Sequence, residues 1–245
     1  MDDNFVINLQ SLELYHIFID AFFRTKELAD EKQKVEQLVL ELIPRVVADK
    51  LKAGEIVAPE TFASVTIFFS DVVSFTRISA AATPLEVVKL LNMMYTIFDD
   101  VSAQFDVYKV ATIGDAYFVA SGVPIRNGNK HAAEISKMAL ALLKSVSNLQ
   151  IPHLPSETLK LRIGLHSGSC VAGVAGVKMP RYLLFGDTVD IASRMESEGG
   201  VMRIHVSETT VAHLKEVGGF NLEYRAQLTI KGRRICTYWL NDNSN

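Results

Sequence analysis

Two acidic residues, Asp71 and Asp115, stand where predicted strands end. Residues 65–70 form a continuous apolar run, typical of a strand buried on both faces, and Asp71 follows directly. Asp115 lies between the apolar runs 107–112 and 116–121, which together indicate a hairpin. Two carboxylates brought together repel each other unless a cation lies between them, so this pair could bind a divalent metal ion. Acidic residues beside turns are also common in proteins without a metal site, so the spacing alone leaves both interpretations open.

The elements that must position these carboxylates alternate between strand and helix from Val65 onward. Helical spacing of apolar residues predicts helices over 84–105, 131–146 and 188–197, and a strand is predicted over 159–166. The order is β-α-β-β-α-β, the ferredoxin-like arrangement of an antiparallel sheet backed by helices. Its first and third strands are central neighbours, so the two carboxylates can meet. We therefore predict an α+β fold: a ferredoxin-like β-α-β-β-α-β core with extra C-terminal strands, preceded by a helical coiled-coil linker.

The segment before the first strand has a different composition. Residues 25–52 are rich in charge and contain no glycine, and apolar residues recur there at heptad spacing. The residues concerned are Leu28, Leu38, Val35 and Leu42. The heptad pattern extends over only about two heptads. On periodicity alone it is equally compatible with a short coiled coil and with a single amphipathic helix. The predicted organisation is an N-terminal helical segment or remnant of an upstream region (1–24), a signalling helix or coiled-coil linker (25–58), and a catalytic domain (59–245).

Composition excludes several classes of protein. The chain has 245 residues, of which 49% are hydrophobic, enough for a packed core and inconsistent with a disordered chain or a disulfide-stapled miniprotein. A net charge of −3 provides no basic field, so a nucleic acid polymer is not an expected partner. Two cysteines cannot form a disulfide framework, which favours a reducing compartment and a cytoplasmic location. The apolar run near the N-terminus is interrupted by polar residues before it reaches the length of a membrane span.

The loop after Asp71 leads into a helix, and its backbone N–H groups could receive phosphate oxygens. The chain has no glycine–lysine P-loop, and no G-x-G-x-x-G motif follows a strand. Nucleotide binding by a P-loop or a Rossmann motif is therefore excluded.

Several strings, in order, resemble the hallmark motifs of class III nucleotidyl cyclases, and most closely those of eukaryotic guanylate cyclases. The resemblance covers about residues 25–241. The strings are LIPRVVA at 42–48, FSDVVSFT at 69–76, VYKV at 107–110, TIGDAY at 112–117, KMPRY at 178–182, LFGDTV at 184–189, ASRMES at 192–197, IKG at 230–232 and TYWL at 237–240. The match before the first strand resembles the signalling helix of such proteins and strengthens the coiled-coil interpretation.

The resemblance implies a dimer in which each catalytic pocket is built from both protomers. Asp71 and Asp115 would hold two Mg²⁺ or Mn²⁺ ions, with the carbonyl oxygen of Val72 as a further ligand. The amides of Phe75 and Thr76 would lie against phosphate oxygens. The implied reaction is the lyase reaction that converts GTP to cyclic GMP and pyrophosphate.

The facing protomer would contribute the remaining groups, and here the chain departs from the family. Arg194 would stabilise charge on the α-phosphate and Lys231 would bind the terminal phosphates. Guanylate cyclases have a glutamate at the position of Ala111 and a cysteine at that of Leu183, a pair that reads guanine. They have an asparagine at the position of Asp190. Since Asp190 lies four residues before Arg194, we expect these two side chains to pair.

The losses fall on one half-site, while both metal-binding aspartates remain. We therefore predict a guanylate cyclase domain that acts as the metal-donating half of a dimer, with GTP as substrate and another cyclase domain as partner. The alternatives are a homodimeric cyclase with altered or relaxed base specificity, using ATP or GTP, and a weakly active regulatory pseudo-cyclase. An upstream sensor or membrane domain is expected in the full-length protein, with this chain as the cytosolic part of a membrane-bound receptor.

Overall fold

The computed structural model describes residues 3–176 and 178–242. Residues 1–2 and 243–245, which we placed in the predicted N-terminal segment and catalytic domain, lie outside the described residues. The chain divides into two compact units, Met1–Ile56 and Val57–Asn245. Among the described residues, no helix has both the length and the apolar character that crossing a bilayer requires.

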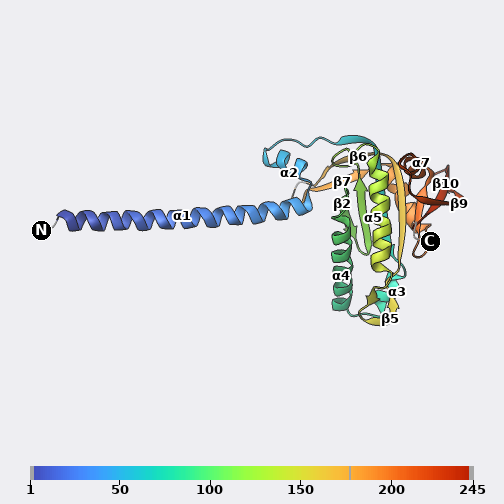
Figure 1. Cartoon of the computed structure of the whole chain (residues 1–245), viewed down its shortest axis with the longest axis horizontal. Coiled ribbons are helices and arrows are strands. Elements are labelled where there is room, and N and C mark those ends of the chain that lie inside the picture. Colours follow the sequence, from blue (N-terminus) through green and yellow to red (C-terminus); the bar gives the residue numbers. More distant parts are fainter. Residues whose placement is uncertain (1–2, 177, 243–245) are drawn as a thin grey trace. The chain divides into compact units, whose positions relative to one another are not determined.

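The first unit consists of two helices. Helix α1 (Asp3–Leu42) is long and continuous, and α2 (Arg45–Lys52) follows after Pro44 (Figure 1). The residue before a proline is disfavoured in helical geometry, which explains why α1 stops where it does. The heptad side chains of α1 are exposed, at 68% for Leu28 and 60% for Val35. Helix α1 runs through residues 25–42, and the assignment of this segment as a signalling helix or coiled-coil linker stays a prediction.

The second unit is built on an eight-stranded sheet in the order β2-β3-β1-β6-β8-β10-β9, with β7 pairing with β6. A separate pair of short strands, β4 and β5, lies outside it. The strands are β1 (Glu60–Val72), β2 (Tyr108–Ile113), β3 (Ala116–Ser121), β4 (Gln150–Ile151), β5 (Leu154–Thr158), β6 (Leu161–Ala175), β7 (Arg181–Phe185), β8 (Ile204–Ser207), β9 (Asn221–Ile230) and β10 (Arg233–Asn241). The helices are α3 (Phe75–Ala80), α4 (Pro84–Ser102), α5 (Lys130–Val146), α6 (Asp187–Ser197) and α7 (Glu208–Val217).

The predicted fold class is confirmed. Strands β2, β3, β1 and β6 are antiparallel neighbours in that order, which is the ferredoxin-like arrangement, and β8, β9 and β10 extend the sheet. Strand β1 pairs with β3 so that Ser70 faces Tyr117, and this pairing puts the end of β1 beside the β2–β3 turn. The two positions predicted to converge are thus adjacent.

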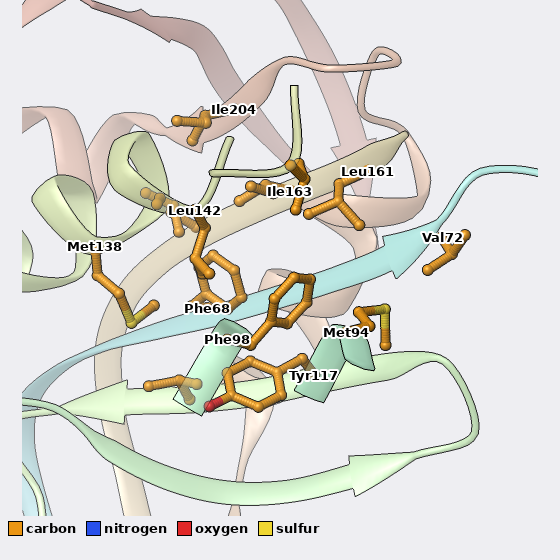
Figure 2. Close-up of a cluster of buried hydrophobic side chains, with 14 of the residues drawn as sticks. Phe68, Val72, Met94, Phe98, Tyr117, Met138, Leu142, Leu161, Ile163 and Ile204 are labelled. Carbon is orange, nitrogen blue, oxygen red and sulfur yellow. The ribbon is translucent and has the colours of Figure 1, made fainter. Parts of the chain in front are cut away.

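Two layers of helix cover opposite faces of the sheet. On one face, apolar side chains of α4 and α5 pack against alternate residues of the central strands (Figure 2). This core includes Phe68 of β1 and Ile163 of β6, both fully buried. Because successive strand residues point to opposite faces, Asp71 and Arg162 lie on the other face, where α6 packs.

One strand is much longer than the sequence pattern indicates. We predicted a strand over 159–166, but β6 continues to Ala175. Glycine lowers strand propensity, so a glycine-rich segment is easily taken for a loop. Here β7 pairs along it, with Gly173 opposite Leu183, and this pairing supplies the backbone hydrogen bonds that the composition alone does not predict.

Candidate functional site

The structure brings Asp71 and Asp115 together, as predicted. Asp71 is the next-to-last residue of β1, and Asp115 lies in the turn between β2 and β3. Gly114 provides that turn with a φ of 62°, a conformation that glycine adopts without strain. The Asp115 carboxylate accepts a hydrogen bond from the Val72 backbone N–H, with a distance of 3.2 Å from N to Oδ2.

The electrostatics of this pair favour a bound cation. Burial raises the pKa of Asp115 to about 7, and the hydrogen bond and charge of Asp71 add to the effect. Oxygen atoms of two carboxylates and of the Val72 carbonyl are the ligands that Mg²⁺ and Mn²⁺ prefer. Across the described part of the chain, no group of three or more His, Cys, Asp or Glu side chains could hold a metal ion. Two carboxylates and a carbonyl fit a hard cation that takes its other ligands from water and substrate phosphates, as Mg²⁺ commonly does.

Two further residues, Arg162 and Glu196, lie beside Asp71, and neither is among the predicted site residues. Arg162 faces Asp71 in the pairing of β6 with β1, and its Nη2 lies 2.8 Å from Asp71 Oδ2. Its Nε lies 3.3 Å from Oε1 of Glu196 on α6. Burial raises the pKa of Glu196 to about 7, and the Asp71 charge contributes to the rise. A signal was present in the sequence, since Arg162 is a charged residue inside the otherwise apolar segment 161–165.

Helix α6 is held directly against β6. A methyl group placed on Gly164 would lie 2.0 Å from the backbone nitrogen of Glu196 and 2.5 Å from the carbonyl carbon of Met195. Only a residue without a side chain permits this approach of helix to strand. Since Arg162 lies two residues before Gly164 on the same face of β6, this contact sets the position of Glu196 relative to Arg162 and Asp71.

Gly164→Ala should therefore destabilise the protein strongly. Because the clash is with backbone rather than with a flexible side chain, we expect a loss of about 3 kcal/mol in the free energy of unfolding. This value is the upper end of the usual cost of adding atoms to a packed core. Urea denaturation of the purified chain measures it. Gly173→Ala is the matched control on the same strand, since a methyl group there would lie at an ordinary 3.5 Å from Pro59. Equal unfolding midpoints for the two variants would contradict the prediction.

The loop after β1 turns sharply at Ser74 and leads into helix α3. Ser74 adopts a φ of 60°, in the left-handed region that favours glycine. Helix α3 begins at Phe75, followed by Thr76. The first amides of a helix have no acceptor within it, so these N–H groups are available to an anion.

The two predicted base-reading positions lie on strands that are not paired with each other, β2 and β7. Ala111 belongs to β2, beside an irregularity in its pairing with β3, and Leu183 belongs to β7. The rings of Tyr108 and Tyr182 on these strands meet edge to face, with centroids 5.8 Å apart. Neither Ala111 nor Leu183 has a side-chain hydrogen-bonding group, so this pair offers a base only apolar contact.

The predicted pairing of Asp190 with Arg194 is wrong. Asp190 pairs with Lys231, whose Nζ also lies 3.0 Å from Oδ1 of Asp187. Lys231 comes from the turn between β9 and β10, and its ammonium group bridges two carboxylates of the first turn of α6. The pKa of Lys231 is raised by these hydrogen bonds, first that of Asp190 and then that of Asp187. Arg194 is exposed and forms no ion pair within residues 3–176 and 178–242.

The predicted site residues thus fall into two groups on one chain. Asp71, Asp115 and Val72 meet at the end of β1, and Glu196 contacts this group through Arg162. Arg194 precedes Glu196 by two residues, which on a helix places the two side chains on nearly opposite sides of α6. The carboxylate pair and Arg194 therefore face away from each other.

Comparison with known proteins gives a consistent result. Residues 57–242 match the family model described as the adenylate and guanylate cyclase catalytic domain. The chain is 56% identical over 218 residues to the receptor-type guanylate cyclase gcy-6 of Caenorhabditis elegans and to atrial natriuretic peptide receptor 2 of Homo sapiens. The match covers 89% of this chain but only 20% and 21% of those proteins.

Solved structures show the same similarity. The guanylate cyclase domain of RhGC from Catenaria anguillulae, solved in complex with GTP, is 36% identical and superposes with a TM-score of 0.70. The similarity covers 74% of this chain and 98% of that one.

Proposed function

Because this chain belongs to the adenylate and guanylate cyclase catalytic domain family, we propose that it converts GTP to cyclic GMP and pyrophosphate as the metal-donating half of a dimer. One observation carries the proposal. Asp71 and Asp115 lie together at the end of β1, whereas in the other half-site Ala111 and Leu183 have no hydrogen-bonding side chain and Asp190 is paired with Lys231. The 3′-hydroxyl of the ribose loses its proton and attacks the α-phosphorus, and the bond to pyrophosphate breaks.

The residues at the end of β1 have distinct roles in this reaction. Asp71, Asp115 and the Val72 carbonyl would hold two Mg²⁺ or Mn²⁺ ions. Bound there, such ions would lower the pKa of the attacking hydroxyl and stabilise charge on the leaving group. The amides of Phe75 and Thr76 bind phosphate oxygens and orient the triphosphate. Together these groups form the half of a pocket that does not recognise the base.

The second half of the pocket comes from the partner domain. In this chain, Ala111 and Leu183 offer no hydrogen bond to guanine, and the loss of such bonds removes most of the discrimination between bases. The Lys231 ammonium, proposed to bind phosphate, is already bridged to Asp187 and Asp190. A partner that retains glutamate, cysteine and asparagine at these positions supplies what this chain lacks.

The placement of Arg194 supports a dimer of this kind. Since Arg194 and Glu196 point to nearly opposite sides of α6, one protomer cannot direct its own arginine and its own aspartates at one substrate. The exposed heptad residues of α1, Leu28, Leu38, Val35 and Leu42, offer a surface for a coiled coil with the partner's linker.

The chain spans about a fifth of the length of the curated relatives that it matches. Those relatives are named as receptors. We therefore place this chain as the cytosolic catalytic part of a longer receptor, with a sensor or membrane domain upstream that acts through α1.

Turnover of the purified chain with Mn²⁺ tests the proposal. Cyclic nucleotide formation is measured with GTP or ATP, for the chain alone and mixed with a complementary guanylate cyclase domain. We expect cyclic GMP from the mixture and little from the chain alone. Appreciable cyclic GMP or cyclic AMP from the chain alone would instead identify a homodimer with altered base specificity, and no product under any condition would identify a regulatory pseudo-cyclase.

A further inference from the structure

The turn that carries Asp115 lies at the tip of a hairpin and is held by a helix from another part of the chain. Strands β2 and β3 are joined by only two residues, Gly114 and Asp115, and Ile113 pairs with Ala116 on either side of them. The hydroxyl of Tyr95 on α4 donates a hydrogen bond to the carbonyl oxygen of Gly114. This carbonyl belongs to the planar peptide group that joins Gly114 to Asp115, so the bond restricts the backbone directly before the carboxylate-bearing residue.

Tyr95 is itself held in place by neighbouring side chains. Its ring stacks on that of Tyr117 from β3, with centroids 6.4 Å apart, and Phe98 meets Tyr117 edge to face (Figure 2). The Tyr117 hydroxyl donates to Oδ1 of Asp99, one turn further along α4, at 2.7 Å. The Lys109 ammonium from β2 lies 2.7 Å from both carboxylate oxygens of Asp99. Tyr95 and Asp99, neighbours on one face of α4, therefore contact β2, β3 and the turn between them.

The Tyr95 phenol keeps its proton at neutral pH and so remains a hydrogen-bond donor. Burial raises the pKa of this phenol above its ordinary value, a hydrogen bond with Thr112 opposes the rise in part, and the charges of Asp115 and Asp99 add to it. An unperturbed phenol already titrates near pH 10, well above neutrality. The contact with the Gly114 carbonyl is therefore present under the conditions in which a divalent cation binds to carboxylates.

Repulsion between the two carboxylates is the force that this contact resists. Asp71 and Asp115 lie together before any cation binds, and like charges at short distance repel each other. The Asp115 side chain is held by the Val72 backbone N–H, 3.2 Å from Oδ2, whereas its backbone is held by Tyr95 through Gly114. A ligand that is already in place loses less conformational freedom when the ion arrives, so the ion binds more tightly.

We propose that Tyr95 is a positioning residue of the metal site, whose hydroxyl holds the Gly114 carbonyl and thereby keeps Asp115 in the position that binds a divalent cation. This inference rests on the proposed function, because it takes Asp115 as a metal ligand. The role requires no contact between Tyr95 and the substrate. The net contribution typical of one neutral hydrogen bond corresponds to about fivefold in affinity, so we expect an effect of that size.

Mn²⁺ binding to the nucleotide-free chain tests the proposal. Free Mn²⁺ is followed by electron paramagnetic resonance during titration of the purified protein. We expect Tyr95→Phe, which removes one hydroxyl and changes no charge, to bind Mn²⁺ about fivefold more weakly than wild type. The low-temperature spectrum of the bound ion should also change, because its zero-field splitting depends on the geometry of the ligands. Tyr224→Phe is the matched control, an exposed phenol on the opposite edge strand β9, and should bind as wild type does.

A variant with a different donor separates the hydrogen bond from the packing of the ring. Tyr95→p-aminophenylalanine keeps the ring and places an N–H donor at the same position, so it should recover most of the affinity that Tyr95→Phe loses. Thermal unfolding without metal is measured for each variant. Unchanged Mn²⁺ affinity in Tyr95→Phe would overturn the proposal even if its unfolding temperature falls, because the bond would then only stabilise the hairpin. Equally weak binding by both variants would overturn it as well.

The result is separable from that of the proposed function, since this test involves no turnover. Mn²⁺ binding that persists unchanged in Asp115→Asn would show that Asp115 is not a ligand and would overturn the role of Tyr95. A chain that shows the expected Mn²⁺ results but makes no cyclic GMP in any mixture would refute the proposed function and leave the role of Tyr95 intact.

Discussion

Asp71→Asn in this chain should abolish cyclic GMP formation by its mixture with a complementary guanylate cyclase domain, whereas Arg194→Ala should leave the rate nearly intact. Asparagine keeps the shape of the side chain but removes the charge that holds a divalent ion. The loss of a metal ion that stabilises the transition state is worth several kcal/mol, so we expect the rate to fall at least about 1,000-fold. Arg194 faces away from Asp71 and serves the other, degenerate pocket, so its removal should change the rate by less than about twofold.

The contrast between the two variants shows whether this chain contributes the metal ligands or the arginine to the active pocket of the dimer. The measurement is the initial rate of cyclic GMP formation with Mn²⁺ and GTP at saturating partner. Asp100→Asn, at an exposed position on α4, is the matched control and should retain the full rate. If Arg194→Ala abolishes turnover while Asp71→Asn does not, this chain donates the arginine rather than the metal ligands, and the proposed assignment is wrong.

Restoring the family residues at three positions should produce activity in the chain alone. The triple variant Ala111→Glu, Leu183→Cys and Asp190→Asn returns hydrogen-bonding groups to the base and removes one of the two carboxylates that hold Lys231. A site that hydrogen-bonds its substrate typically gains about 10,000-fold in discrimination over one that cannot. Against a background near zero, we expect an increase of at least about 100-fold in cyclic GMP formation by the homodimer.

Partial restorations show which defect limits the rate. The double variant Ala111→Glu/Leu183→Cys restores hydrogen-bonding groups for the base and leaves Asp190 paired with Lys231. Asp190→Asn alone weakens the interaction with Lys231 but provides no hydrogen bond to the base. We expect each to be much less active than the triple variant, because recognition of the base and of the triphosphate act on the same bound substrate. A triple variant with no homodimer activity would mean that these positions do not limit it.

The arrangement of the core was predictable because its signals are local. Apolar alternation and helical spacing identified the core strands and helices between Val65 and His166, though not the short β4 and β5, and chain order then left the ferredoxin-like arrangement as the natural packing. The elements β8 and α7 were not predicted. Strand β8 has only four residues, Ile204–Ser207, and is stabilised by pairing with β6 and β10, which are distant in sequence. A strand of that length has too few residues for an alternation of apolar and polar side chains to be recognised.

At the candidate site too, local spacing predicted the element to which a residue belongs but not its tertiary contacts. Helical spacing correctly placed Asp190 and Arg194 on α6, but it could not choose the partner of Asp190. A residue four positions away along a helix is one neighbour among several, and the ammonium of Lys231 approaches from a turn 41 residues later in the chain. Surface pairs contribute little individually, so the tertiary position of the competitor decides which of them forms.

The sequence by itself determined the chemical character of this protein. It specified carboxylates at Asp71 and Asp115, and it replaced base-reading groups with Ala111 and Leu183. Only the tertiary structure decided that Arg162 pairs with Asp71, a residue 91 positions away. The physical reason is that side-chain chemistry belongs to each residue, whereas a contact across a sheet depends on which strands become neighbours and on which face each residue points.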